Sequence, residues 1–149
     1  MLNLPRFLPY RLTKLSGFIS RDLGGIYSER FNLTITEWRI IALLGSEDGL
    51  TAQVIGTRAS LDKVRISRAV DRLVKAGRVK KQTHKTDRRS SLLHLTKSGR
   101  AILEEIVPLA QDYEKRLLKE FSPEEIEILD GFLNRLDSKA ESLQKDNHR

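Results

Sequence analysis

The sequence predicts a mainly α-helical fold with a small β-hairpin, the arrangement of a winged helix-turn-helix. Two short amphipathic segments, 51–61 and 62–76, are joined by a tight turn, as in a helix-turn-helix. Two short β-compatible segments, 78–84 and 91–95, follow with a charged turn between them, as in a wing. Longer segments with helical periodicity precede and follow this module, so we expect helices on both sides of it.

The first flanking helix is expected over residues 8–31, where apolar side chains recur three and four positions apart. Two adjacent glycines weaken this helix near its end but need not stop it. A second helix is expected to begin after Thr34, which has capping-box spacing to Glu37, although Thr36 is an alternative cap.

The helix expected over about 62–76 has two chemically different faces, and Thr51 is expected to cap the shorter helix before it. One face is an apolar stripe of Ile66, Ala69, Val70, Leu73 and Val74. The opposite face carries Arg65, Arg68, Arg72 and Lys75. Asp62 is interpreted as a first-turn residue favoured by the helix dipole, and Gly77 as the C′ residue that ends the helix.

Beyond the hairpin the pattern becomes helical again. Thr96 is expected to cap a helix over about 97–119, which Pro108 should kink. A final helix should open at Ser122, with a proline at its first position and a capping box to Glu125. The last six residues are expected to fray. The apolar side chains of this final helix have heptad-like spacing: Ile126, Leu129, Leu133, Leu136, Ala140 and Leu143.

Charge is concentrated in the central module of a chain that, at 149 residues, is long enough for one domain. Residues 51–100 hold 14 basic and three acidic side chains, a net charge of +11, whereas the remainder has a net charge of −4. This indicates a footprint for a polyanion, and the alternative is a solvated basic face. No run of about 18 apolar residues occurs and the N-terminus does not resemble a signal peptide, so we expect a cytoplasmic protein with no membrane contact.

Catalysis and metal binding are not expected. The sequence has no nucleophile elbow, glycine-rich phosphate loop or paired-carboxylate motif, which predicts no catalytic residues and no cofactor. The absence of cysteine removes disulfides, thiolate metal sites and cysteine redox sensing. His84 and His94 could face each other across the hairpin, but surface or cross-strand positions are favoured over a metal site because no carboxylate or thiol cluster accompanies them.

The basic helix suits the major groove of B-DNA, which admits a single helix. Its N-terminal half holds the residues expected to reach base edges and phosphates: Lys63, Arg65, Ser67 and Arg68. Arg72 and Lys75, further along, are expected to contact phosphates or to remain exposed charges.

The charged turn of the hairpin is expected to enter the minor groove, whose negative potential attracts arginine. Its candidate DNA contacts are Asp87, Arg88 and Arg89. Asp87 can hold the Arg89 guanidinium in a fork geometry and so order it before binding. The alternative is that Asp87 only favours the turn.

The sequence resembles the MarR family of bacterial winged-helix transcriptional regulators. The resemblance is carried by the stretches LTITEWRIIALL, VDRLVKAGRVKK and TDRRSSLLHLTKSG. In the last of these, Asp-Arg-Arg at 87–89 and Leu-Thr-Lys-Ser-Gly at 95–99 match the family's wing pattern. The resemblance covers nearly the whole chain and departs from the family at Arg78, where an apolar residue is usual.

The resemblance implies a homodimer that binds double-stranded DNA, with a helical dimerisation region at 1–33 and 97–149 and a winged DNA-binding region at 34–96. The apolar stripe of the final helix agrees with this, because little of one chain remains to cover it. Two-fold symmetry implies a pseudo-palindromic operator with half-sites about 10 bp apart. We therefore expect a transcriptional repressor, and the alternative is a non-specific architectural DNA- or RNA-binding protein.

The resemblance also implies a small-molecule effector, since members of the family commonly respond to anionic or aromatic ligands. An arginine can hold a carboxylate while aromatic side chains face a ring. The start LPYRL resembles that of family members which sense aromatic acids or their thioesters, and this resemblance implies such a ligand. The alternative is that Tyr10 and Trp38 belong to the core. Without cysteine, this chain cannot use the family's thiol oxidation, which favours release of DNA by a ligand. The candidate lining is Tyr10, Arg11, Tyr27, Trp38 and Arg39.

Overall fold

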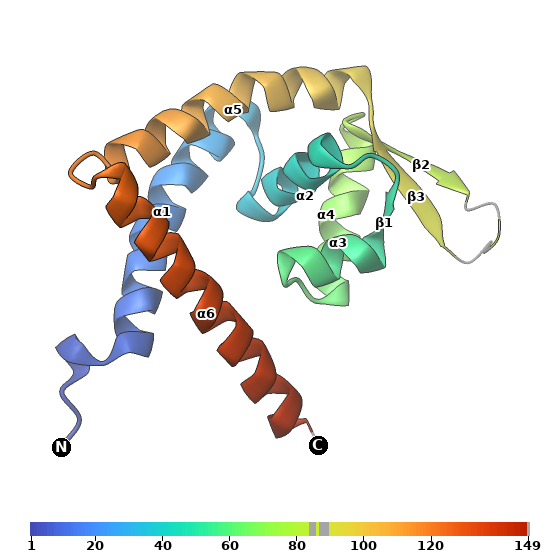
Figure 1. Cartoon of the computed structure of the whole chain (residues 1–149). Coiled ribbons are helices and arrows are strands. Elements are labelled where there is room, and N and C mark those ends of the chain that lie inside the picture. The colour runs from blue at the N-terminus through green and yellow to red at the C-terminus, as the bar shows by residue number, and fades with distance from the viewer. Residues whose placement is uncertain (84–85, 87–89, 149) are drawn as a thin grey trace. The chain divides into compact units, whose positions relative to one another are not determined.

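The computed structural model describes residues 1–83, 86 and 90–148 (Figure 1). These residues form two compact units, 1–111 and 112–149, and one helix runs from the first into the second. The elements are η1 (Leu4–Arg6), α1 (Leu8–Phe31), α2 (Ile35–Ser46), β1 (Leu50–Thr51), α3 (Ala52–Ala59), α4 (Lys63–Lys75), β2 (Val79–Thr83), β3 (Ser91–Leu95), α5 (Lys97–Leu117) and α6 (Pro123–Asn147).

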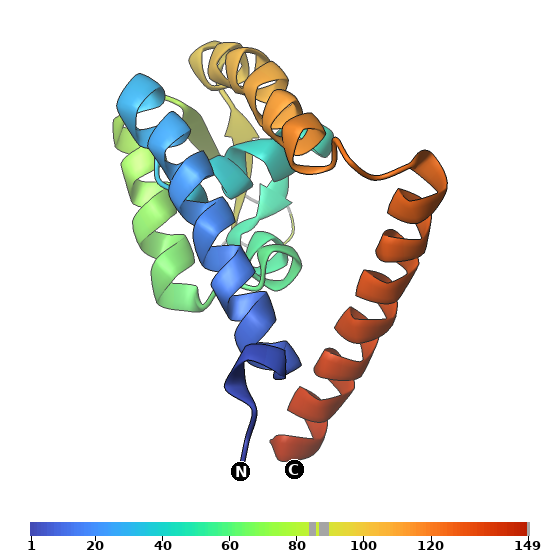
Figure 2. The same ribbon diagram turned by 90° about the vertical axis from the view of Figure 1, so that its left-hand side faces the viewer.

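Helix α1 has the bounds that its sequence predicts, and α2 begins directly after Thr34 as expected. Figure 2 shows α1 as one continuous helix, so its adjacent glycines do not interrupt it. It ends at Asn32, whose φ of 52° is the left-handed conformation that asparagine tolerates better than most residues. Thr34 caps α2: its hydroxyl accepts the Glu37 N–H at 3.1 Å, and the Glu37 carboxylate accepts the Thr34 N–H at 3.4 Å. The capping box is confirmed, and Thr36 is not the cap.

The two wing strands are confirmed, and a third strand joins them. The sheet is antiparallel with the order β1-β3-β2, in which Leu93 of β3 pairs with Leu50 of β1 on one side and with Lys81 of β2 on the other. The sequence could not show β1, because two residues are too few to display a period. Strand β1 leads directly into α3, so the sheet ties the wing to the helix-turn-helix.

The core of the first unit is built from one face of each helix and of the sheet. The stripe expected on α4 is confirmed, since Ile66, Ala69, Val70 and Leu73 are buried and Val74 is partly buried. Helix α5 passes over α2 (Figure 1), and Leu103 occupies the space that a side chain at Gly45 would need. The other fully buried large side chains are Tyr27, Leu33, Ile40, Ile41, Leu44, Ile55, Val79, Leu93 and Ile106.

The second unit contains the end of α5 and the whole of α6. Ser122 and Glu125 form the expected capping box, with hydrogen bonds of 3.0 and 3.1 Å. Helix α6 continues to Asn147, so the prediction that the tail frays from residue 144 is wrong. The apolar residues of α6 that remain exposed are Ile128, Leu129, Phe132, Leu133, Leu136 and Leu143.

Candidate nucleic-acid interface

Helix α4 begins with a side-chain cap. Asp62 precedes the first helical residue, and its Oδ1 accepts the Arg65 N–H at 2.9 Å. The prediction that Asp62 lies in the first turn is corrected by one position, because a short carboxylate before the helix can reach the third backbone N–H. The Arg65 Nε also lies 3.7 Å from Asp62 Oδ2, so the cap holds this arginine at the start of the helix.

Helix α4 ends in a Schellman motif, as Gly77 predicts. Gly77 has a φ of 73°, its N–H donates to the Val74 carbonyl at 3.0 Å, and the Arg78 N–H donates to the Leu73 carbonyl at 2.9 Å. Glycine adopts this left-handed conformation without steric cost. The chain therefore turns sharply from α4 into β2, which places the wing strands next to the helix.

The outer face of α4 differs between its two halves. All four residues expected to contact DNA in the N-terminal half are exposed, and within the described part of the chain Lys63 and Arg68 form no ion pair. Arg72, in the C-terminal half, instead has its Nε 2.7 Å from the Oε1 of Glu37 on α2. The exposed fraction of the Arg72 side chain is 58%, whereas that of Glu37 is 7%. The two halves thus have different electrostatic surroundings.

A groove of about 780 Å³ is lined by residues of α3, of α4 and of the wing strands. Asp71 and Lys81 form an ion pair at 3.7 Å that joins α4 to β2. The cation that pairs with Asp71 therefore comes from a strand and not from its own helix. Lys63 and Ser67 also line the groove, so its rim carries groups that can bind phosphate.

The tip of the wing, with the candidate contacts Asp87, Arg88 and Arg89, lies outside the described residues, as does His84. Its base is held by Thr96, whose hydroxyl donates to the Gly77 carbonyl at 2.6 Å and accepts the Gly99 N–H at 3.1 Å. The Arg78 carbonyl occupies the space that a side chain at position 99 would need. The base of the wing is therefore closed by hydrogen bonds between the two strand ends and the start of α5.

Arg78, the departure from the family pattern, has a definite partner. Its Nη2 donates to the Phe31 carbonyl at 2.9 Å, at the end of α1. The last carbonyls of a helix have no partner within the helix, so a guanidinium can donate hydrogen bonds to them. Its positive charge also interacts favourably with the negative, C-terminal end of the helix dipole. Arg78 therefore joins α1 to the base of the wing, where an apolar residue would only pack.

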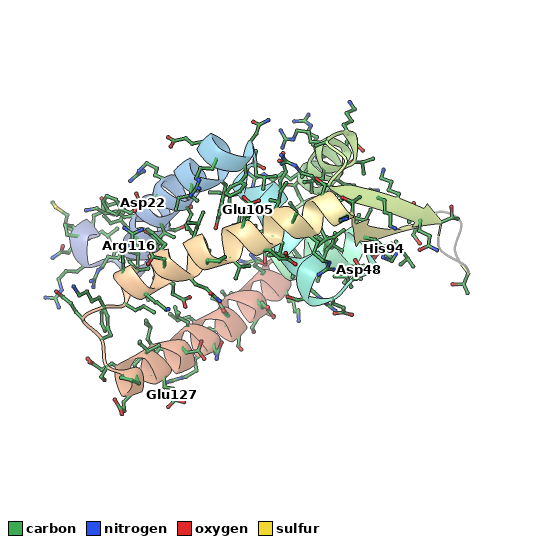
Figure 3. All side chains as sticks on the ribbon, turned by 90° about the horizontal axis from the view of Figure 1, so that it is seen from above. Asp22, Asp48, His94, Glu105, Arg116 and Glu127 are labelled. Atoms are coloured by element: carbon green, nitrogen blue, oxygen red, sulfur yellow. The ribbon has the colours of Figure 1, made fainter. Side chains whose placement is uncertain are left out.

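Asp48 and His94 form a second link at the base of the sheet (Figure 3), which the sequence did not reveal. The His94 Nδ1 lies 2.8 Å from Asp48 Oδ2, and the Leu95 N–H donates to Asp48 Oδ1 at 3.2 Å. Burial raises the pKa of Asp48, but the hydrogen bonds from His94 and Leu95 outweigh it and hold the pKa below its ordinary value. In the register of β2 and β3, Lys80 lies opposite His94, so the expectation that His84 could face His94 is wrong. The side-chain partner of His94 is instead Asp48, in the loop before β1.

The five candidate effector residues fall into two groups. Tyr27 and Trp38 are in contact, with ring centroids 5.3 Å apart. Burial raises the pKa of Tyr27, and the exposed Arg39 lowers it by a smaller amount. Tyr10 and Arg11 are exposed in the first turn of α1, about 25 Å along the helix axis from Tyr27. One chain therefore does not bring all five together.

Other kinds of site find no support in the part of the chain that the structure describes. Three or more histidine, aspartate or glutamate side chains placed to hold a metal ion do not occur there. None of the helices described is both long enough and apolar enough to cross a membrane. Two of the links that the sequence analysis missed, Glu37–Arg72 and Asp48–His94, join residues that are far apart along the chain.

Comparison with known proteins gives consistent matches. The model of the MarR family matches residues 31–90. The transcriptional regulator SarZ of Staphylococcus saprophyticus is 30% identical over 104 residues, which cover 70% of this chain and 68% of SarZ. The regulator PecS of Dickeya dadantii is 28% identical over 129 residues, which cover 85% of this chain and 77% of PecS.

The fold is also similar to those of solved structures. A MarR/EmrR family transcriptional regulator from Acinetobacter sp. ADP1 is 29% identical and superposes with a TM-score of 0.87. The match covers 95% of this chain and 99% of that one. The likeness thus extends well beyond the residues that match the family model.

Proposed function

Since this chain belongs to the MarR family of DNA-binding transcriptional regulators, we propose that it is a homodimeric repressor released from a pseudo-palindromic operator by a small ligand. The observation that carries this proposal is the N-terminal half of α4. Lys63 and Arg68 are exposed there without ion-pair partners in the described chain, inside a segment whose net charge is +11. Cations free of internal partners can reach guanine edges and phosphates at no cost in broken ion pairs.

Homodimer formation is supported by exposed apolar side chains on two helices. Helix α1 exposes Leu8, Leu12, Leu15 and Phe18, and α6 exposes a larger set that includes Leu133 and Leu136. Exposed apolar side chains that recur along one helix commonly mark an interface. A two-fold axis would then place two α4 helices in successive major grooves.

Release by a ligand is supported by the contact between Tyr27 and Trp38, with Arg39 beside it. These groups suit an aromatic acid, whose carboxylate would bind the guanidinium. Tyr10 and Arg11 would contact the same ligand only if a partner protomer supplied them. The tight packing of Tyr27, which is 2% exposed, supports a core role for this residue until a ligand opens the site.

Selection of binding sites from random duplexes tests the proposal. The selected DNA should be an inverted repeat with half-sites about 10 bp apart, bound at least about 1,000-fold more tightly than unrelated duplexes at physiological salt. Arg68→Ala should weaken binding by about 1–3 kcal/mol and relax specificity at one base pair. Lys139→Ala, on α6, is the matched loss of an exposed cation and should change little. Equal affinity for all duplexes would instead support an architectural protein.

The ligand is tested separately, by a thermal-shift screen of aromatic acids and their thioesters against the free protein. A true effector should raise the melting temperature and lower operator affinity, and Arg39→Ala should reduce both effects. A compound that stabilises the protein without releasing DNA is not the effector. If no compound does both, ligand release is wrong while operator binding stands.

A further inference from the structure

Arg72 differs from the other cations of α4 because its ion-pair partner lies on another helix, α2. Its Nε lies 2.7 Å from a carboxylate oxygen of Glu37, whose side chain is 7% exposed. Glu37 is the one buried acidic or basic residue among those that the structure describes. A buried charge is the informative exception in a protein interior, because burying it is costly unless a partner compensates it.

Both carboxylate oxygens of Glu37 have partners. Oε1 meets Arg72, while Oε2 accepts the Thr34 N–H and the Glu37 N–H donates to the Thr34 hydroxyl. The capping box thus fixes the carboxylate at the first turn of α2. Arg72 therefore forms its ion pair with a carboxylate that is held in place on α2, a helix that packs against α4.

This contact constrains α4 in a way that its apolar stripe does not. Burial of Val70 and Leu73 turns the apolar face of α4 towards the core, but it fixes no point on the polar face of the helix. The ion pair does fix such a point, because its energy falls as the Arg72 guanidinium moves away from the Glu37 carboxylate. Arg68 lies one helical turn before Arg72, so a rotation of α4 would change where Arg68 projects.

We propose that Arg72 is a positioning residue, which with Glu37 sets the orientation of α4, and that it does not bind a DNA phosphate. The inference rests on the proposed binding of DNA by α4. It has a consequence that a phosphate contact does not share: Glu37 is buried and cannot touch DNA, yet it controls how well the operator is distinguished from other sequences.

The alternative uses the exposed part of Arg72, since the guanidinium has further N–H groups that could reach a phosphate. The two roles respond differently to salt. Each lost phosphate contact reduces the slope of log affinity against log salt concentration by about 1. A change in the orientation of α4 that keeps the phosphate contacts leaves this slope unchanged.

The experiment measures binding of full-length variants to the operator selected by the wild type and to a scrambled duplex, over a range of salt. Glu37→Gln and Arg72→Gln should each lower operator affinity about tenfold, with scrambled-duplex affinity and the salt slope unchanged. The double variant should lose no more than either single one, because both remove one contact. Lys75→Gln, which removes an exposed cation from the same turn, is the control and should leave selectivity unchanged.

Folding is checked by thermal melts, and Arg72→Lys is the milder variant if a glutamine variant melts too low. Lysine keeps the charge but lacks Nε, so it should still lose selectivity under the positioning role and bind as the wild type under the phosphate role. Normal selectivity in folded Glu37→Gln protein, or a slope reduced by about 1 in Arg72→Gln, would overturn the proposal. A wild type that selects no operator would instead overturn the proposed function on which it rests.

Discussion

Helices α4 and α6 are both amphipathic, but the apolar face of α4 is buried and that of α6 is exposed. In α4 the apolar stripe is buried, with Leu73 1% exposed. In α6 the corresponding side chains stay open, with Leu133 42% and Phe132 53% exposed. The same kind of pattern therefore ends in a completed core in one helix and in uncovered apolar surface in the other.

The difference in burial suggests that α4 contributes through its polar face and α6 through its apolar face. Because the apolar face of α4 is fully used inside the chain, its polar face is free to meet DNA. The apolar face of α6 still exposes surface whose removal from water would stabilise an assembly by about 25 cal/mol per Å². We expect changes in α4 to act within one chain and changes in α6 to act through association.

Leu133→Asp should have the largest effect. A carboxylate in the proposed interface cannot be buried without a partner, so the dimer should dissociate. Operator affinity should fall by about 100-fold or more, because two linked half-site contacts become independent. Light scattering after gel filtration gives the mass of the particle, and Ser138→Asp, five positions later on another face of α6, is the control. A dimer of normal stability in Leu133→Asp would show that α6 is not the interface.

Leu73→Ala should destabilise the chain by about 2–5 kcal/mol, through the cavity it leaves in the core. Urea unfolding should show the same loss at every protein concentration. The matched change Leu136→Ala, on α6, should lower stability only at concentrations where the dimer forms. If both variants depend on concentration in the same way, the contrast between the two helices fails.

Arg89→Ala should weaken operator binding by about 1–3 kcal/mol while the dimer stays intact. The reason is loss of an arginine from the minor groove, and Asp87→Ala should act in the same direction but less. Fluorescence anisotropy with the operator measures both. Tighter binding by Asp87→Ala would mean that this carboxylate repels DNA and does not order Arg89.

Asp48→Asn should have the smallest effect, below about 1 kcal/mol, because the ion pair with His94 is partly exposed to solvent. The pKa of Asp48 is lowered by folding, so its carboxylate stabilises the fold above the ordinary value of 3.8 and loses this effect as the pH falls below it. Thermal melts should therefore separate variant and wild type at pH 6 and converge near pH 3. An equal gap at both pH values would argue against ionisation as the cause.

The parts of the fold that could be predicted from the sequence are those set by residues close together along the chain. Caps at Thr34, Thr51 and Ser122, and the glycine at 77, act within a few residues, so the sequence alone places the ends of these helices. The buried stripe of α4 was equally readable, since a helical period needs only consecutive residues. Strand β1 was not, because two residues carry no pattern and pair only once β3 is in place.

In the candidate site, too, some features could be predicted from the sequence and others could not. The cations of α4 could be chosen from sequence because helical spacing puts them opposite the apolar stripe. That Arg72 meets Glu37 could not, since 35 positions separate them and the capping box already explained the acid. The separation of Tyr10 and Arg11 from Tyr27, by contrast, follows from a single helix over 8–31, which the sequence predicted.

By itself, then, the sequence determined what depends on neighbours along the chain: the helices, their caps, the polarity of their faces and the concentration of positive charge at 51–100. Tertiary structure decided what depends on distant segments meeting. It paired Glu37 with Arg72, Asp71 with Lys81, Asp48 with His94 and Arg78 with the end of α1. The physical reason is that a charged side chain shows its sign in the sequence, whereas its partner is chosen only when packing brings two surfaces within hydrogen-bond distance.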